Sequence, residues 1–178
     1  LAAGGAEPEQ RVALCLSDPF EIVIGMIATL KSGAAFTVIS PDDPAETQAR
    51  LLRQCAPVVV LADAATPLPD GFARSTLTKL AETSPAAPFR PSRPLLADHP
   101  AYLVFTSGSS GARKGVVVSH RALVSYLRWF AGLEGIGPGR RSALVTSAAY
   151  DLGYSTLFGA LMLGGAVLQI VLGGALCF

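Results

Sequence analysis

RVALCLSDPFEIVIGMIATLKSGAAFTVISPDDPAETQARLLRQCAPVVVLAD, residues 11–63, is the stretch that decides the fold class. Its short apolar runs RVALCLS, AAFTVIS and PVVVLAD have the character of strands. Between them lie two segments with helical spacing, DPFEIVIGMIATLKSG and PDDPAETQARLLRQCA, with acidic residues near their starts and Gly33 after the first. Strands that alternate with helices across short links predict an α/β fold, in which a parallel sheet is joined by crossover helices.

The rest of the chain continues this pattern after one interruption. Prolines recur through residues 64–100, so we expect a surface connection there, with at most a short helix near TLTKLAET. Beyond it the sequence predicts strands at 101–105, 115–119, 141–147 and 166–171, and helices at 120–133 and over most of 150–165. Because the α/β pattern resumes directly after the connection, residues 1–178 are interpreted as part of one domain.

Composition excludes several classes of function. The chain has 178 residues, of which 51% are hydrophobic, and a formal net charge of +1. With no basic block, we expect no nucleic-acid surface. The three cysteines lie far apart and only two histidines are present, so the sequence predicts no metal site and buried thiols in a reducing, cytoplasmic setting.

Residues 152–178 contain no charged side chain and are long enough to span a bilayer, which needs about 20 apolar residues. Glycine pairs at Gly164–Gly165 and Gly173–Gly174 divide this segment into pieces the length of a helix and of a strand. We therefore expect a buried helix and strand rather than a membrane span.

One loop points to a ligand. FTSGSSGARKG, residues 105–115, follows an apolar strand and contains glycines, hydroxyl side chains and one lysine. Glycines let the backbone approach a ligand closely, exposed N–H groups and hydroxyls bind anions, and a lysine adds positive charge. These properties favour a polyphosphate site. The loop is not a Walker A motif, because Lys114 is followed by glycine, and a polar turn without a ligand stays an open alternative.

The longer stretch YLVFTSGSSGARKGVVVSHRAL, residues 102–123, resembles the phosphate-binding signature of the adenylate-forming (AMP-binding) enzymes. Arg113 is the one departure, because the family usually has proline there. The segment from RVALCLS to SPDDPAE, with LKSGAAF inside it, is most similar to the amino-acid adenylation domains of nonribosomal peptide synthetases. The resemblance implies that ATP phosphates are held by Thr106, Ser107, Gly108, Ser109, Ser110, Gly111, Lys114 and Gly115.

The resemblance also implies a role for Asp151, which follows Tyr150 in a region almost free of charge. In the family, an aspartate at this spacing pairs with the α-ammonium group of the amino-acid substrate. The alternative from the residues alone is that Asp151 caps the following helix. His120 comes shortly after the loop, and we interpret it as a histidine at a helix start rather than as a catalytic group.

By resemblance, the full enzyme joins a carboxylate to AMP at the expense of Mg2+-bound ATP, releases pyrophosphate and passes the acyl group to a phosphopantetheine thiol on a carrier domain. No residue here matches the family's catalytic lysine or its magnesium ligands, and the ending LGGALCF, residues 172–178, departs from the family. We therefore expect a fragment that is inactive alone. A fragment of an acyl-CoA synthetase or fatty-acyl-AMP ligase, and a non-catalytic nucleotide-binding remnant, are the alternatives.

Overall fold

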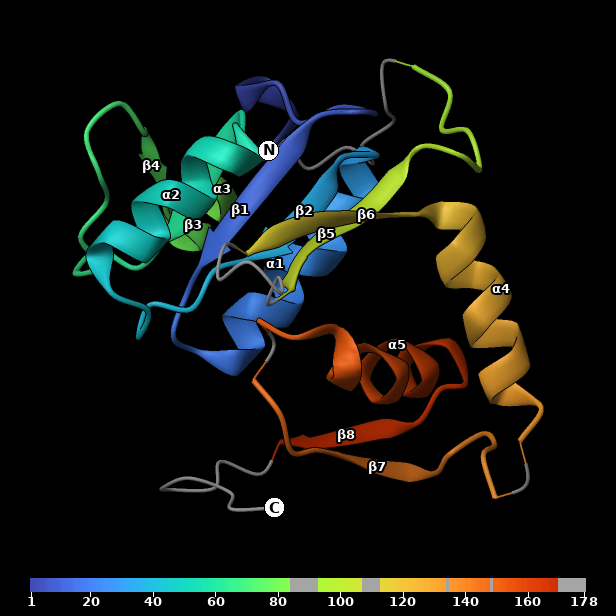
Figure 1. Ribbon diagram of the computed structural model, residues 1–178. Helices are drawn as coiled ribbons and strands as arrows, with labels where there is room; N and C mark the ends of the chain where they lie inside the picture. Colours follow the sequence, from blue (N-terminus) through green and yellow to red (C-terminus); the bar gives the residue numbers. More distant parts are fainter. Residues whose placement is uncertain (84–92, 107–112, 134, 148, 170–178) are drawn as a thin grey trace. The chain divides into compact units, whose positions relative to one another are not determined.

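The computed structural model describes residues 1–83, 93–106, 113–133, 135–147 and 149–169. The chain forms two compact units, Leu1–Arg121 and Ala122–Phe178. Figure 1 labels the helices and strands of both.

The first unit is built on a six-stranded sheet. Its strands, in the order β4-β3-β1-β2-β5-β6, are β1 (Arg11–Cys15), β2 (Ala35–Val38), β3 (Val59–Ala62), β4 (Arg74–Ser75), β5 (Pro100–Thr106) and β6 (Lys114–Ser119). Every neighbouring pair is parallel except β5 and β6. The expected parallel sheet is confirmed. β6 runs antiparallel because the link from Thr106 to Lys114 is too short for a crossover, which needs about a dozen residues.

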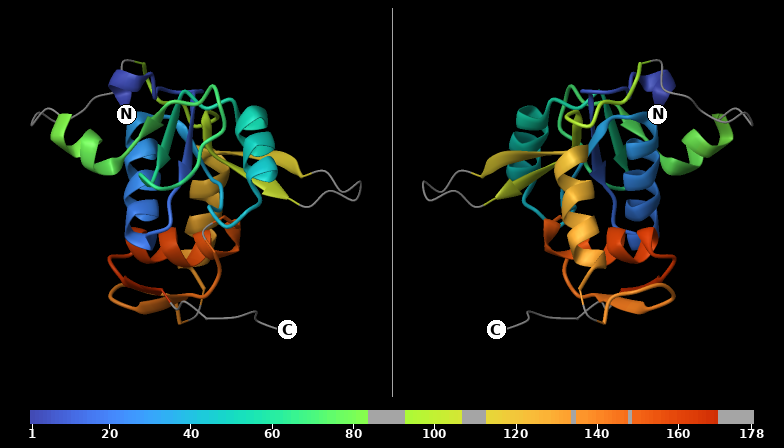
Figure 2. Two further views of the ribbon diagram at one scale, coloured as in Figure 1. Left: turned by 90° about the vertical axis from the view of Figure 1, so that its left-hand side faces the viewer. Right: turned by 90° about the vertical axis from the view of Figure 1, so that its right-hand side faces the viewer.

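The two crossover helices cover opposite faces of this sheet (Figure 2). The chain passes from β1 to β2 through α1 (Pro19–Ser32), then returns past β1 to β3 through α2 (Ala45–Cys55). Because crossovers between parallel strands are right-handed, connections that run in opposite directions along the sheet place their helices on opposite faces. The reversal of direction therefore produces a sheet that is covered on both sides.

Local sequence sets the ends of α1. The Asp18 carboxylate accepts hydrogen bonds from the backbone N–H groups of Phe20 and Glu21, at 2.8 and 3.0 Å, and Pro19 occupies the first helical position. Gly33 ends the helix in the left-handed conformation, with φ at 86°. These are the start and stop signals expected from the sequence.

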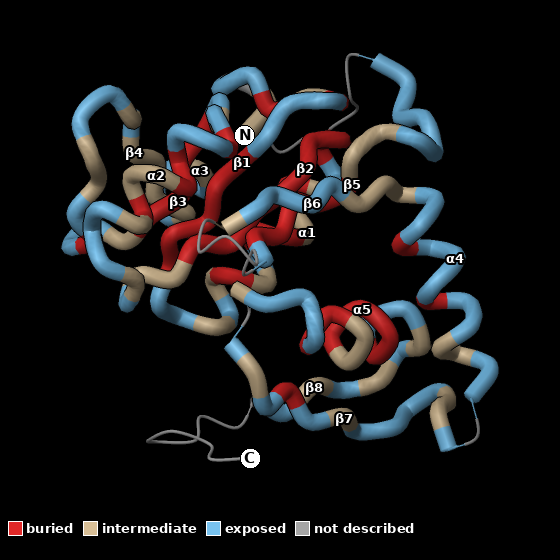
Figure 3. The backbone as a smooth tube through the Cα atoms, viewed as in Figure 1, coloured by how far each residue is buried: buried red, intermediate tan, exposed pale blue. Residues whose placement is uncertain are grey.

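The core of the first unit lies on both faces of β1, β2 and β3, which are almost entirely buried (Figure 3). Successive side chains of β1 point to opposite faces of the sheet. Toward α2, Ala13 and Cys15 belong to a cluster of buried side chains that also includes Leu51 and Leu52. Toward α1, Leu14 packs so close to Gly25 that a Cβ there would lie 3.0 Å from the Leu14 Cδ2 atom.

The connection at residues 64–100 contains one helix among its described residues, α3 (Leu77–Thr83), at the position expected for a short helix. It also forms β4, which the sequence did not predict. The Arg74 guanidinium holds this edge strand in place by donating to the backbone carbonyls of Ala64 and Thr66.

In the second unit, α5 (Tyr154–Met162) packs on a parallel pair of strands, β7 (Arg141–Leu144) and β8 (Ala166–Gln169). The unit also contains most of α4 (His120–Ala131) and a 3-10 turn, η2 (Asp151–Gly153). A Cβ at Gly159 would lie 2.6 Å from the Phe130 ring, so glycine lets α5 approach α4. In the described part of the chain, no helix is long and apolar enough to cross a membrane.

Candidate functional site

The β5–β6 hairpin brings together the two ends of the predicted phosphate loop. Thr106, the last residue of β5, pairs with Lys114, the first residue of β6, and the Thr106 hydroxyl donates to the Lys114 carbonyl at 3.5 Å. Both residues are exposed. Ser107, Gly108, Ser109, Ser110 and Gly111 lie outside the described residues. The hairpin therefore presents one hydroxyl and one ammonium group side by side where the loop begins and ends.

The hairpin lies at an edge of the sheet that is suited to ligands. β1, β2, β3 and β5 run parallel, so their carboxyl ends share one edge of the sheet. Thr106 stands at this edge, together with Ser17, Ser40 and Asp63, which follow the other strands. In open α/β sheets ligands bind outside the carboxyl ends of the strands. The fold thus places the start of the loop where a ligand site is expected.

Gly115 follows Lys114 and lies opposite Phe105 on β5. A Cβ built at Gly115 would lie 3.3 Å from the Phe105 ring and 3.3 Å from the Leu103 Cδ1 atom. Such contacts are tight, so these two buried side chains would have to move to admit alanine. Glycine at this position keeps β6 close to β5 beside the loop.

Charges along this edge are unevenly distributed. Asp63 and Asp18 lie near the carboxyl ends of β3 and β1, and the Ser17 backbone N–H donates to the Asp63 carboxylate at 2.9 Å. The pKa of Glu21 is raised, first by desolvation and then by the carboxylates of Asp63 and Asp18. An anionic ligand would be repelled there, and it would meet the positive charge of Lys114 at the start of β6.

Arg113, which precedes Lys114, makes a contact that the sequence did not indicate. Its guanidinium makes a bidentate ion pair with Asp43, with Nη1 2.9 Å from Oδ2 and Nη2 3.1 Å from Oδ1. The two residues are 70 positions apart. From the sequence, Asp43 was only one of the acidic residues near the start of a helix, and no local pattern links it to Arg113.

His120 begins α4, as expected, and its backbone N–H donates to the His99 carbonyl at 3.0 Å. The Nε2 atom of His120 is buried, and no hydrogen-bond partner for it exists among the described residues. Burial lowers the pKa of His120, and the nearby His99 lowers it further. The neutral, packed imidazole agrees with a structural histidine at a helix start.

Asp151 lies in the second unit, where it is exposed and begins η2. The residue at the N-cap of α5 is Gly153, and no side chain makes a cap hydrogen bond there. The alternative role of Asp151 as a helix cap is therefore wrong: the turn η2 intervenes between Asp151 and α5. Asp151 remains at the surface of the second unit, and Tyr150, which precedes it in the chain, is exposed as well.

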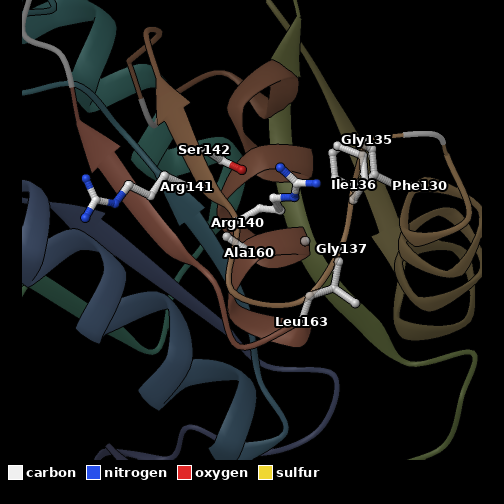
Figure 4. Close-up of a pocket in the computed structure, with 10 residues that line it drawn as sticks. Phe130, Gly135, Ile136, Gly137, Arg140, Arg141, Ser142, Ala160 and Leu163 are labelled. Atoms are coloured by element: carbon white, nitrogen blue, oxygen red, sulfur yellow. The ribbon is translucent and has the colours of Figure 1, made fainter.

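The second unit contains a pocket of about 200 Å³, shown in Figure 4. The Arg140 and Arg141 side chains point in different directions around it (Figure 4). Its lining consists of Phe130, Gly135, Ile136, Gly137, Arg140, Arg141, Ser142, Gly159, Ala160 and Leu163. None of the residues that the sequence assigned to a ligand lines this pocket, so we do not identify it with the phosphate site.

Cys15 and Cys55 are buried and free, as expected. Desolvation raises the pKa of Cys15 to about 12 and that of Cys55 to about 11. Among the residues that the structure describes, no group of three or more histidine, cysteine or acidic side chains could hold a metal ion.

The chain is similar to known proteins over most of its length. The family described as AMP-binding enzyme matches residues 1–171, and the match ends where the sequence departs from the family. The chain is 34% identical over 163 residues to bacitracin synthase 3 of Bacillus licheniformis, covering 90% of this chain and 2% of that protein. It is 34% identical over 173 residues to the AMB antimetabolite synthetase AmbB of Pseudomonas aeruginosa, covering 94% of this chain and 14% of that protein.

The chain is also similar in fold to solved structures. The nonribosomal peptide synthetase FmoA3, in its form bound to alpha-methyl-L-serine-AMP, is 27% identical with a TM-score of 0.82, over 94% of this chain and 19% of that one. CmiS6 is 26% identical with a TM-score of 0.76, over 96% of this chain and 41% of that one. The chain therefore spans less than half the length of each of these relatives.

Proposed function

The chain belongs to the AMP-binding enzyme family, and on that premise we propose that residues 1–178 are part of a single domain that activates an amino acid by adenylation. In this reaction a carboxylate oxygen attacks the α-phosphorus of ATP. The bond between the α-phosphorus and the oxygen that bridges to the β-phosphate breaks, and pyrophosphate leaves. The products are an aminoacyl-AMP and pyrophosphate. Transfer to a phosphopantetheine thiol on a carrier domain would then release AMP. The similarity to peptide synthetases supports an amino acid as substrate.

One observation carries the proposal: the β5–β6 hairpin pairs Thr106 with Lys114 at the edge where the parallel strands end. In the proposed complex the Lys114 ammonium binds oxygens of the β- and γ-phosphates. The Thr106 hydroxyl turns from the Lys114 carbonyl, to which it donates at 3.5 Å, and donates to a phosphate oxygen instead. Backbone N–H groups of Ser107, Gly108, Ser109, Ser110 and Gly111 complete the cradle, and Gly115 keeps the second strand close. Charge that builds on the departing diphosphate would be stabilised by these donors.

Mg2+ would accompany ATP and neutralise part of the phosphate charge. No residue of this chain is assigned to it. Asp151 is proposed to bind the α-ammonium group of the amino acid, since an exposed carboxylate is suited to a cationic partner.

Binding of ATP tests the proposal directly. The purified 178-residue chain is titrated with Mg-ATP by calorimetry, beside Lys114→Ala and the matched control Lys31→Ala, which removes another exposed lysine from the end of α1. A hydrogen bond to a charged group contributes about 1.5–3 kcal/mol, so Lys114→Ala should weaken ATP binding by tenfold or more. Lys31→Ala should bind as the parent does. Equal binding by all three proteins would refute the role of the loop.

The substrate class is tested by ATP–pyrophosphate exchange in the longest reading frame that contains this chain. Exchange that depends on an amino acid supports the proposal. Exchange with fatty acids alone would assign the chain to the acyl-CoA synthetase and fatty-acyl-AMP ligase group. ATP binding without any exchange would indicate that the chain is a non-catalytic nucleotide-binding remnant.

A further inference from the structure

The ion pair between Arg113 and Asp43 has a geometry that holds both partners in place. Its two N–O contacts join a guanidinium fork to both oxygens of one carboxylate, which fixes direction as well as distance. The Arg113 side chain is 31% exposed and that of Asp43 is 17% exposed. Because the pair is largely screened from solvent, it resists competition from water and salt better than a surface pair does.

Asp43 is itself anchored to the fold. Its backbone N–H donates to the Ser40 carbonyl at 3.2 Å, which closes a turn after β2. The Gln48 side chain, 4% exposed on α2, donates to the carbonyls of Asp43 and Pro41 at 2.7 and 2.9 Å. The carboxylate that holds Arg113 thus projects from a turn that is tied to a buried helix face.

Arg113 immediately precedes Lys114, so any constraint on Arg113 acts on the backbone that carries the Lys114 ammonium. On the other side, Lys114 is fixed by its pairing with Thr106 across the hairpin. The family usually has proline at position 113, a residue that restricts its own backbone. Here a side-chain contact to a distant turn provides a restraint at the same place.

We propose that the Arg113–Asp43 ion pair positions Lys114 for nucleotide binding, with Asp43 acting through Arg113 and without touching the nucleotide. This inference rests on the proposed function, because it assigns the pair to the same ATP site. It names Asp43 as a positioning residue that lies outside the signature and on a different strand connection.

A double-mutant cycle in the full chain tests the pair, with Mg-ATP affinity as the readout. Asp43→Asn and Arg113→Gln break the same contact from opposite sides. Coupling energies of contacting residues correspond to between about twofold and a hundredfold, so each single change should weaken ATP binding by about fivefold. The double variant should bind Mg-ATP about as tightly as the single variant with the lower affinity, because the same contact is lost in all three proteins.

The chain offers a matched control pair. Arg121 and Asp98 also form a bidentate contact, at 2.7 and 3.1 Å, but their side chains are 65% and 77% exposed. Asp98→Asn and Arg121→Gln make the same chemical changes and should leave ATP affinity unaltered. Circular dichroism and unfolding midpoints of all variants separate a loss of positioning from a loss of folding, since a purely structural role would lower the midpoint without a specific change in affinity of the folded protein.

The outcomes are distinct. Asp43→Asn removes a negative charge and should by simple electrostatics favour an anionic ligand, so weaker binding supports positioning. Unchanged or tighter binding by Asp43→Asn, with Arg113→Gln still weaker, would mean that Arg113 contacts phosphate directly and would overturn the proposal. If Lys114→Ala weakens binding but neither member of the pair does, the inference fails and the proposed function survives. If the parent chain binds no ATP, both fail together.

Discussion

Replacement of Gly33 by alanine should destabilise the first unit more than the loss of a helix cap alone would suggest. Gly33 ends α1 with φ at 86°, a conformation that costs a residue with a side chain about 1–2 kcal/mol. A Cβ at this position would also lie 2.9 Å from the Cγ atom and 3.1 Å from the Cδ atom of Pro8, which is buried. Overpacking of this kind adds about 1–3 kcal/mol.

The sum is about 2–5 kcal/mol, a large part of the 5–15 kcal/mol that stabilises a typical domain. Gly71 gives the matched control, because its φ is 90° and a Cβ there meets no atom within 4 Å. Gly71→Ala should therefore cost only the conformational part, about 1–2 kcal/mol. Urea unfolding followed by far-UV circular dichroism measures the free energy of unfolding of both variants. Amide hydrogen exchange in α1 reports separately on the effect of Gly33→Ala at the end of that helix.

The contact with Pro8 can be isolated by a second cycle. Pro8→Ala removes the Cγ and Cδ atoms, so in that background Gly33→Ala should cost no more than Gly71→Ala does. Equal destabilisation by Gly33→Ala and Gly71→Ala in the parent chain would contradict the packing argument, and so would a penalty at Gly33 that persists without the Pro8 ring.

Two further predictions concern titratable groups. The pKa of His120 is lowered from 6.5 in the folded chain, so its contribution to stability is fully present above that value and is lost as the pH falls below it. The free energy of unfolding should fall as the pH drops below 6.5, and less so in His120→Gln; an identical slope in both proteins would exclude His120 as the cause. The pKa values of Cys15 and Cys55, at about 12 and 11, keep both thiols protonated at neutral pH. Mass spectrometry after iodoacetamide treatment should find neither alkylated until urea unfolds the chain, and rapid labelling of the native chain would count against this burial.

Much of the fold follows from local patterns in the sequence. The strands β1, β2 and β3 are continuous apolar runs because both of their faces are covered, and the signals at Asp18 and Gly33 mark the ends of α1 within the chain itself. The sequence also located the two ends of the predicted phosphate loop, because strand and signature adjoin there. Each of these features depends on residues that are neighbours along the chain.

Other features exist only once the chain has folded. The edge strand β4 and the placement of α1 and α2 on opposite faces depend on how strands are ordered in the sheet, which no local pattern encodes. The turn η2 displaced Asp151 from the helix cap that its spacing suggested. The sequence shows Arg113 as a departure from a signature and Asp43 as one acid among several. Only the tertiary structure joins them, because the distance between two side chains 70 residues apart is decided by packing and not by local sequence.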